Sequence, residues 1–204
     1  MRKERPAQRD VNSIEDLAAF ICRWDSPKEA ENEPHKSFKR SPVGNINFRG
    51  EIAGSFAYPY FPSEVDFWRS IEPGVRCLVS VIVSDGGFIT YTSCEGHQYN
   101  SESGAECHVG IVPRNFQELV ILYRTLKKVE ADLNRCLHHS RFEVVPSHLL
   151  DNFSNIKVSV IDFYLRKQSD VSWSRYLDTL TFEAQLASES MRENFLVFLG
   201  GGGS

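Results

Sequence analysis

The chain has 204 residues, 25% of them charged, and a formal net charge of -4 at pH 7. This length suffices for one sizeable hydrophobic core, and the mild acidity argues against a protein that coats nucleic acid or an anionic membrane. The five cysteines lack the spacing of a disulfide framework. No apolar run reaches the roughly 20 residues that span a bilayer, and no secretory signal follows the basic start, so we expect a cytoplasmic protein.

Composition along the chain predicts its organisation. We expect a flexible basic N-terminus over residues 1–11, a single domain over 12–199, and an engineered glycine–serine linker over 200–204. Proline and glycine are frequent between residues 26 and 62, which predicts a long loop segment. Its aromatic residues have two interpretations, packing in the domain's own core or binding a protein partner. They are Phe56, Tyr58, Tyr60 and Phe61.

Capping residues and apolar periodicity predict the helices. A capping-box pattern at 12–16 begins the first, Ser63 the second, Asn115 the long third and Asp170 the last. The third carries an apolar stripe from Phe116 through Leu119, Val120, Tyr123, Leu126, Val129 and Leu133 to Leu137. Residues 75–83 fit either a helix or a strand. We favour a helix opened by Pro73, with a hairpin as the alternative.

Strands are predicted at 88–92, 106–112, 142–145 and 156–165, and residues 146–155 are expected to be irregular. The first two would form an antiparallel hairpin. Asp162 lies in an otherwise apolar run and needs a polar partner if it is buried. Together these elements predict an α+β fold: a single domain with a small, largely antiparallel sheet of about four strands and long helices packed on one face.

The turn after the first hairpin strand is the candidate site. Cys94, Glu95 and His97 surround Gly96, which permits a tight backbone turn, and Glu106 and His108 begin the next strand. Side chains alternate along a strand, so Glu106 and His108 are expected on one face. We predict that Cys94, Glu95, His97, Glu106 and His108 form a catalytic cluster.

Three kinds of chemistry fit this cluster. In the first, Cys94 is a nucleophile, one imidazole draws off its proton and a carboxylate orients that imidazole. In the second, His97, His108 and Glu106 hold a divalent metal ion that activates water. In the third, Cys94 and His97 join Cys107 or His108 in a structural zinc site.

The segment from Gly87 to His97, with the sequence GFITYTSCEGH, resembles a pattern in small phage and bacterial accessory proteins. It is more distantly similar to the Ser-Ser-Cys-Ser-Gly-Arg turn of the tRNA wybutosine-synthesis methyltransferase component, with Glu95 and His97 in place of that family's Ser and Arg. The resemblance implies a nucleotide or nucleic-acid substrate and a setting such as phage defence or a toxin effector.

The main functional hypothesis is therefore a cytoplasmic effector that acts as a hydrolase or transferase on a nucleotide or nucleic acid, in a bacterial phage-defence system. One alternative is a non-catalytic interaction subunit of a larger defence complex, which would bind its protein partner through the aromatic segment. Another is an RNA-modification factor, although the Gly-x-Gly-x-x-Gly signature of a dinucleotide-binding loop is absent from the sequence.

Overall fold

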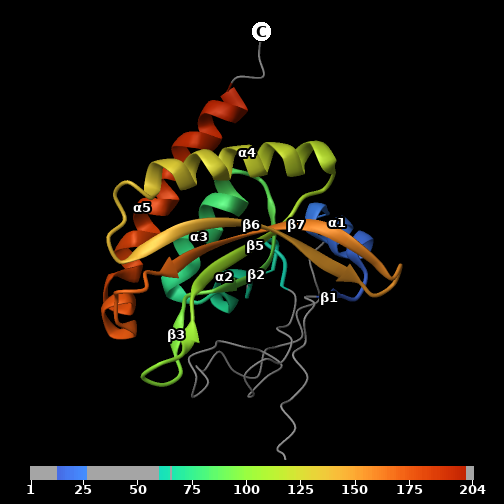
Figure 1. Ribbon diagram of the computed structural model, residues 1–204. Helices are drawn as coiled ribbons and strands as arrows, with labels where there is room; N and C mark the ends of the chain where they lie inside the picture. Colours follow the sequence, from blue (N-terminus) through green and yellow to red (C-terminus); the bar gives the residue numbers. More distant parts are fainter. Residues whose placement is uncertain (1–12, 27–59, 65, 201–204) are drawn as a thin grey trace, which may run out of the picture.

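The computed structural model describes residues 13–26, 60–64 and 66–200 and shows an α+β fold (Figure 1). Its main sheet has five strands in the order β1-β6-β7-β5-β2. Their bounds are Ser13–Ile14 for β1, Ile89–Cys94 for β2, Cys107–Val112 for β5, Ser140–Asp151 for β6 and Ile156–Lys167 for β7. Two short strands, β3 (His97–Gln98) and β4 (Gly104–Ala105), pair with each other.

The prediction of a small, largely antiparallel sheet of about four strands differs from the structure in two respects, because the sheet is mixed and has a fifth strand. The two residues of β1 pair in parallel with Leu150 and Asp151 at the end of β6. The other strand pairs of this sheet are antiparallel. A strand of two residues has no alternation of its own, so sequence periodicity could not reveal it.

The helices pack on the two faces of this sheet. The longest are α4 (Phe116–Leu133) and α5 (Trp173–Gly200), and they lie with α3 (Arg76–Ser80) on one face (Figure 1). Their apolar side chains meet those of Val109, Ile111, Phe163 and Leu165 in the main core. Helix α1 (Leu17–Asp25) packs on Leu149 and Val160, which alternate with the residues beneath α4. The opposite face of the sheet is therefore covered by α1 at one end.

Capping residues, Pro73 and the apolar runs in the sequence predicted several helices and strands correctly. Asn115 caps α4 by accepting a hydrogen bond from the backbone N–H of Glu118 at 2.9 Å. The segment after Glu72 is helical, as favoured, and consists of the 3-10 turn η1 (Pro73–Val75), α3 and the π-helical turn η2 (Val81–Asp85). The predicted hairpin is confirmed by the antiparallel pairing of β2 with β5.

Other elements differ from the prediction. Strand β6 continues through residues 146–151, which were expected to be irregular, and it pairs with β7 along its whole length. Pro146 is tolerated because the other edge of β6 is paired, in the described residues, only at Leu150 and Asp151. The helix expected from Ser63 is the four-residue α2 (Phe67–Ser70). The apolar stripe of α4 is also rotated, since Phe116 is 78% exposed and Leu122 is fully buried.

The aromatic segment is described in part. Tyr60 and Phe61 are buried among core residues, with 7% and 3% of their surface exposed. Phe56 and Tyr58 lie outside the described residues. The described helices include none with both the length and the apolar character needed to cross a bilayer.

Candidate functional site

Cys94 and His108 face each other across two neighbouring strands. Cys94 ends β2 and is the ladder partner of His108 on β5. Directly opposed residues of an antiparallel pair project from the same face of the sheet, so the thiol and the imidazole lie side by side. This face is the one opposite to α4, because Cys107 and Val109, which alternate with His108, are buried in the main core.

A tight turn brings His97 to the same thiol. Gly96 has a positive φ of 91°, which glycine adopts without strain, and its backbone N–H lies 3.4 Å from the Cys94 sulfur. A side chain at this position would also meet Leu180 Cδ2 at 3.0 Å and the Cys107 nitrogen at 3.2 Å. The turn therefore requires glycine both for its conformation and for its close packing.

The carboxylate that orients His97 comes from Glu72. Its Oε1 lies 3.0 Å from His97 Nε2, and its Oε2 accepts the backbone N–H of Glu95 at 2.8 Å. Both side chains of this ion pair are buried, with 6% of His97 and 8% of Glu72 exposed. Glu95 in turn accepts the backbone N–H of Gly74 at 2.7 Å. The two glutamates thus join residues 72–74 to the turn at Gly96.

The charges of these groups depend on one another. Burial alone would raise the pKa of the Cys94 thiol, but hydrogen bonds with His108 and His97 outweigh it and lower the pKa to about 7. Burial works against the imidazolium of His97, yet contacts with Cys94 and Glu72 raise its pKa to about 10. The pKa of His108 is also raised, chiefly by the neighbouring thiolate, against the effect of burial.

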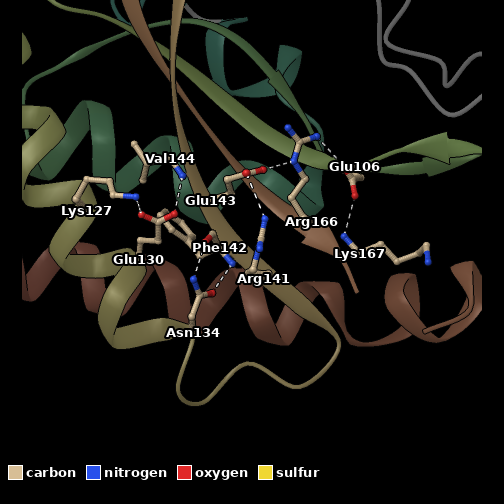
Figure 2. Close-up of polar contacts among 10 residues, drawn as sticks. All are labelled: Glu106, Lys127, Glu130, Asn134, Arg141, Phe142, Glu143, Val144, Arg166 and Lys167. Atoms are coloured by element: carbon tan, nitrogen blue, oxygen red, sulfur yellow. Dashed lines mark hydrogen bonds and ion pairs between the residues drawn. The ribbon is translucent and has the colours of Figure 1, made fainter. Parts of the chain in front are cut away.

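Glu106 does not orient either imidazole. Its carboxylate accepts hydrogen bonds from the Arg166 guanidinium at 2.7 Å and from the Lys167 backbone N–H at 2.9 Å (Figure 2). Arg166 also pairs with Glu143 at 2.6 Å. The contact of Glu106 with His108 is through its backbone carbonyl, 3.5 Å from Nδ1. The structure therefore brings together Cys94, His97 and His108 and turns the Glu106 carboxylate away from them.

The sequence analysis missed Glu72. It assigned the role of orienting an imidazole to a carboxylate nearer in the sequence, Glu95 or Glu106. Glu72 is 25 positions from its histidine, and no motif links them. The available signal was an acidic residue directly before Pro73-Gly74, where a helical turn begins. Glu95, which was predicted to lie in the site, does so as a support, because its N–H and carboxylate hold Glu72 and Gly74.

A metal ion has three potential ligands here. Ligand atoms of Glu72, Cys94 and His97 all lie within 4.8 Å of one another. Thiolate, imidazole and carboxylate are all ligands of zinc, so this set replaces the predicted combination of both histidines with Glu106. Cys107 is fully buried in the core and belongs to no such group among the described residues.

The arrangement defines the site by its chemistry: a partly exposed thiol that contacts two imidazoles, one of them held by a buried carboxylate. It has the parts of a cysteine nucleophile with an oriented histidine. Comparisons with known proteins add no family to this description. No protein-family model matches the chain, and neither a curated protein nor a solved structure matches it significantly.

Proposed function

We propose that this protein is a cysteine-dependent hydrolase or acyltransferase in which the Cys94 thiolate attacks a carbonyl carbon. The observation that carries the proposal is the contact of one partly buried thiol with two imidazoles, together with the 3.0 Å ion pair between His97 and Glu72. A thiolate beside an imidazolium is a strong nucleophile near neutral pH.

The surroundings of the thiol favour a carbonyl over a phosphate ester. Transfer of a phosphoryl group depends on cations that neutralise the phosphate oxygens. In the described part of the chain, Cys94 is hydrogen-bonded by imidazoles and by the Gly96 N–H. Arg166 is bound instead to Glu106 and Glu143. Two proton-carrying rings and a backbone donor suit acyl transfer.

The substrate class in this proposal comes from the sequence resemblance, which implies a nucleotide or nucleic acid and a role as an effector in bacterial phage defence. An acyl group attached to a nucleotide or to an RNA end combines that implication with carbonyl chemistry. The interaction-subunit alternative requires exposed aromatic side chains. Tyr60 and Phe61 give it no support, since both are buried.

Site-resolved alkylation tests the nucleophile. Iodoacetamide should modify Cys94 rapidly at pH 7, ahead of the exposed Cys22 and Cys136 in the same sample, as measured by peptide mass spectrometry. Glu72→Gln should slow modification of Cys94 and leave the two reference thiols unchanged. A Cys94 that reacts no faster than these references contradicts the proposal.

Two further measurements separate the alternatives. Zinc that copurifies at one ion per chain, and whose removal by chelator is needed before Cys94 can be alkylated, would favour the metal site. In cells, the Cys94→Ala, His97→Ala and His108→Ala variants should lose any toxicity or protection against phage. Folded variants that keep the full effect would exclude a catalytic role for the site.

A further inference from the structure

An exposed tyrosine lies at the edge of the site. Tyr99 follows His97 by two positions, and its backbone N–H continues the β3–β4 hairpin by donating to the Ser103 carbonyl at 2.9 Å. Side chains alternate along an extended strand, so Tyr99 projects from the same side of this hairpin as His97. Cys94 and Glu72 lie within electrostatic range of its hydroxyl. The Tyr99 ring therefore stands near the Cys94 thiol, and 49% of the residue is exposed.

Hydrogen bonds fix the shape of the hairpin that carries Tyr99. The Asn100 side chain accepts the backbone N–H groups of Glu102 and Ser103, each at 2.9 Å. The Gln98 side chain donates to the Asn100 carbonyl at 2.9 Å. An asparagine that binds backbone groups of the following residues stabilises a tight turn. Tyr99 is therefore held in place by its own turn before any substrate binds.

Helix α5 supports the base of this hairpin. A carbon atom added at Gly104 of β4 would lie 2.8 Å from Trp173 Cζ3, so the absence of a side chain lets the strand lie directly against the Trp173 ring. That ring packs edge-on against the buried Tyr176, with the two ring centroids 5.7 Å apart. Beyond this base the hairpin projects from the rest of the fold (Figure 1). Tyr99 is thus carried by an arm with a well-packed base.

Contacts within the described residues do not account for an aromatic ring at position 99. In that part of the chain the Tyr99 ring packs against no other aromatic ring, and its hydroxyl forms no hydrogen bond. Tyr164, whose ring lies 5.4 Å from that of His108, differs in this respect. The Arg166 guanidinium covers it, 3.7 Å from the ring centroid. Near the thiol, Tyr99 is therefore the tyrosine that is placed to contact a substrate.

We propose that Tyr99 binds the substrate by stacking on a flat aromatic group next to the carbonyl that Cys94 attacks. The inference rests on the proposed acyl-transfer function and adds a substrate class to it, an ester or thioester that carries an aryl ring or a nucleobase. Tyrosine rings bind such groups by offset stacking, and a ring that is fixed beforehand loses little freedom on binding. Stacking requires no cation, and the Arg166 guanidinium is already bound to two carboxylates.

Two thioesters that differ in their leaving group test this assignment. S-phenyl thioacetate carries a ring, and S-trifluoroethyl thioacetate has a leaving group of similar acidity without one. Formation of acetyl-Cys94, followed by mass spectrometry, gives a maximal rate and a half-saturating concentration for each. Tyr99→Ala should raise the half-saturating concentration of the phenyl compound about 10-fold and leave its maximal rate unchanged. The trifluoroethyl compound should not be affected.

Two variants and a titration without chemistry complete the test. Tyr99→Phe keeps the ring and should behave as the wild type. Phe116→Ala is the matched control, because Phe116 is an exposed aromatic residue on α4, on the other face of the sheet, and it should change neither reaction. In Cys94→Ala protein, adenosine and acetanilide should shift the NMR signals of the Tyr99 ring. The tighter of these two ligands distinguishes a nucleobase from a simple aryl group.

The outcomes are distinguishable. An unchanged half-saturating concentration of the phenyl compound in folded Tyr99→Ala would overturn the assignment. So would an equal loss in Tyr99→Phe, because the hydroxyl and not the ring would then bind the substrate. Tyr99 signals that neither ligand shifts would overturn it as well. A wild-type protein that forms no acetyl-Cys94 from either thioester would instead contradict the proposed function, and the NMR titration would still decide the role of Tyr99.

Discussion

The hydroxyl of Tyr176 on α5 accepts the backbone N–H of Cys107 at 2.9 Å and donates to the carbonyl of Leu165 at 2.6 Å. Cys107 and Leu165 are ladder partners at the end of β5 and β7, so this buried side chain inserts between the strands. It satisfies both backbone groups directly beside His108. The helix-covered side of the sheet thus holds the strand that carries His108.

Tyr176→Phe should destabilise the fold by about 1–3 kcal/mol, because it leaves a buried N–H and a buried C=O without their partner. Urea unfolding followed by circular dichroism measures the free energy of unfolding. Tyr123→Phe is a matched control, because Tyr123 is 38% exposed on α4, and its effect should stay within about 0.5 kcal/mol. Equal effects of the two changes would show that the Tyr176 hydroxyl is dispensable.

His97 should remain protonated far above neutral pH. Its pKa is raised to about 10 by Cys94 and Glu72 against the effect of burial, so the ring loses its proton only as the pH approaches that value. Glu72→Gln removes the carboxylate that favours the cation and should lower the pKa. Nitrogen-15 NMR of the imidazole rings measures this titration, with His148 as an exposed reference. A His97 ring that is neutral at pH 8 in the wild type would contradict the ion pair.

Gly96→Ala should destabilise the protein and slow alkylation of Cys94. A non-glycine residue at a φ of 91° is strained by about 1–3 kcal/mol, and the added carbon would also press on Leu180. Gly87→Ala is the control, because Gly87 also has a positive φ of 69° but has open space around it. Thermal unfolding should show a larger loss at Gly96 than at Gly87. Equal losses would mean that crowding at the turn contributes nothing.

Tyr91→Phe should cost about 1–3 kcal/mol, because it removes a hydrogen-bond donor from the buried carboxylate of Asp162. Asp162→Asn in that background should recover part of the loss, since an uncharged amide is cheaper to bury. A double-mutant cycle in chemical unfolding measures the coupling of the two residues. Additive effects would indicate that the 2.6 Å contact does not stabilise the fold.

The fold was predictable where neighbours in sequence determine the structure. Asn115 caps the helix that it directly precedes, and the apolar runs on either side of the turn pair as a hairpin. Strand β6 was only partly predicted, because Pro146 and polar residues after it argue against a strand. Their tolerance depends on which edge of the sheet is paired, and a single sequence does not contain that information.

The sequence predicted the thiol and the two histidines of the candidate site but not the carboxylate that binds His97. Cys94, His97 and His108 lie within one hairpin, so local geometry brings them together. The Glu72 carboxylate, which binds His97, belongs to a separate segment of the chain. The Glu106 carboxylate binds Arg166, 60 positions away in the sequence, and not an imidazole of the site. Which carboxylate binds which cation depends on charged residues far apart in the sequence, and the spacing of residues along the chain does not predict it.

The pairing of β2 with β5 shifts by one residue between Thr90 and Thr92, which leaves Tyr91 as an extra residue in β2. If the ladder ran without this shift and paired Tyr91 with Gly110, it would align Cys94 with Cys107 and place Ser93 opposite His108. The sulfur would then point toward the helices, and a hydroxyl would stand beside the imidazole. The unpaired Tyr91 therefore decides that a thiol and not an alcohol stands opposite the His108 imidazole.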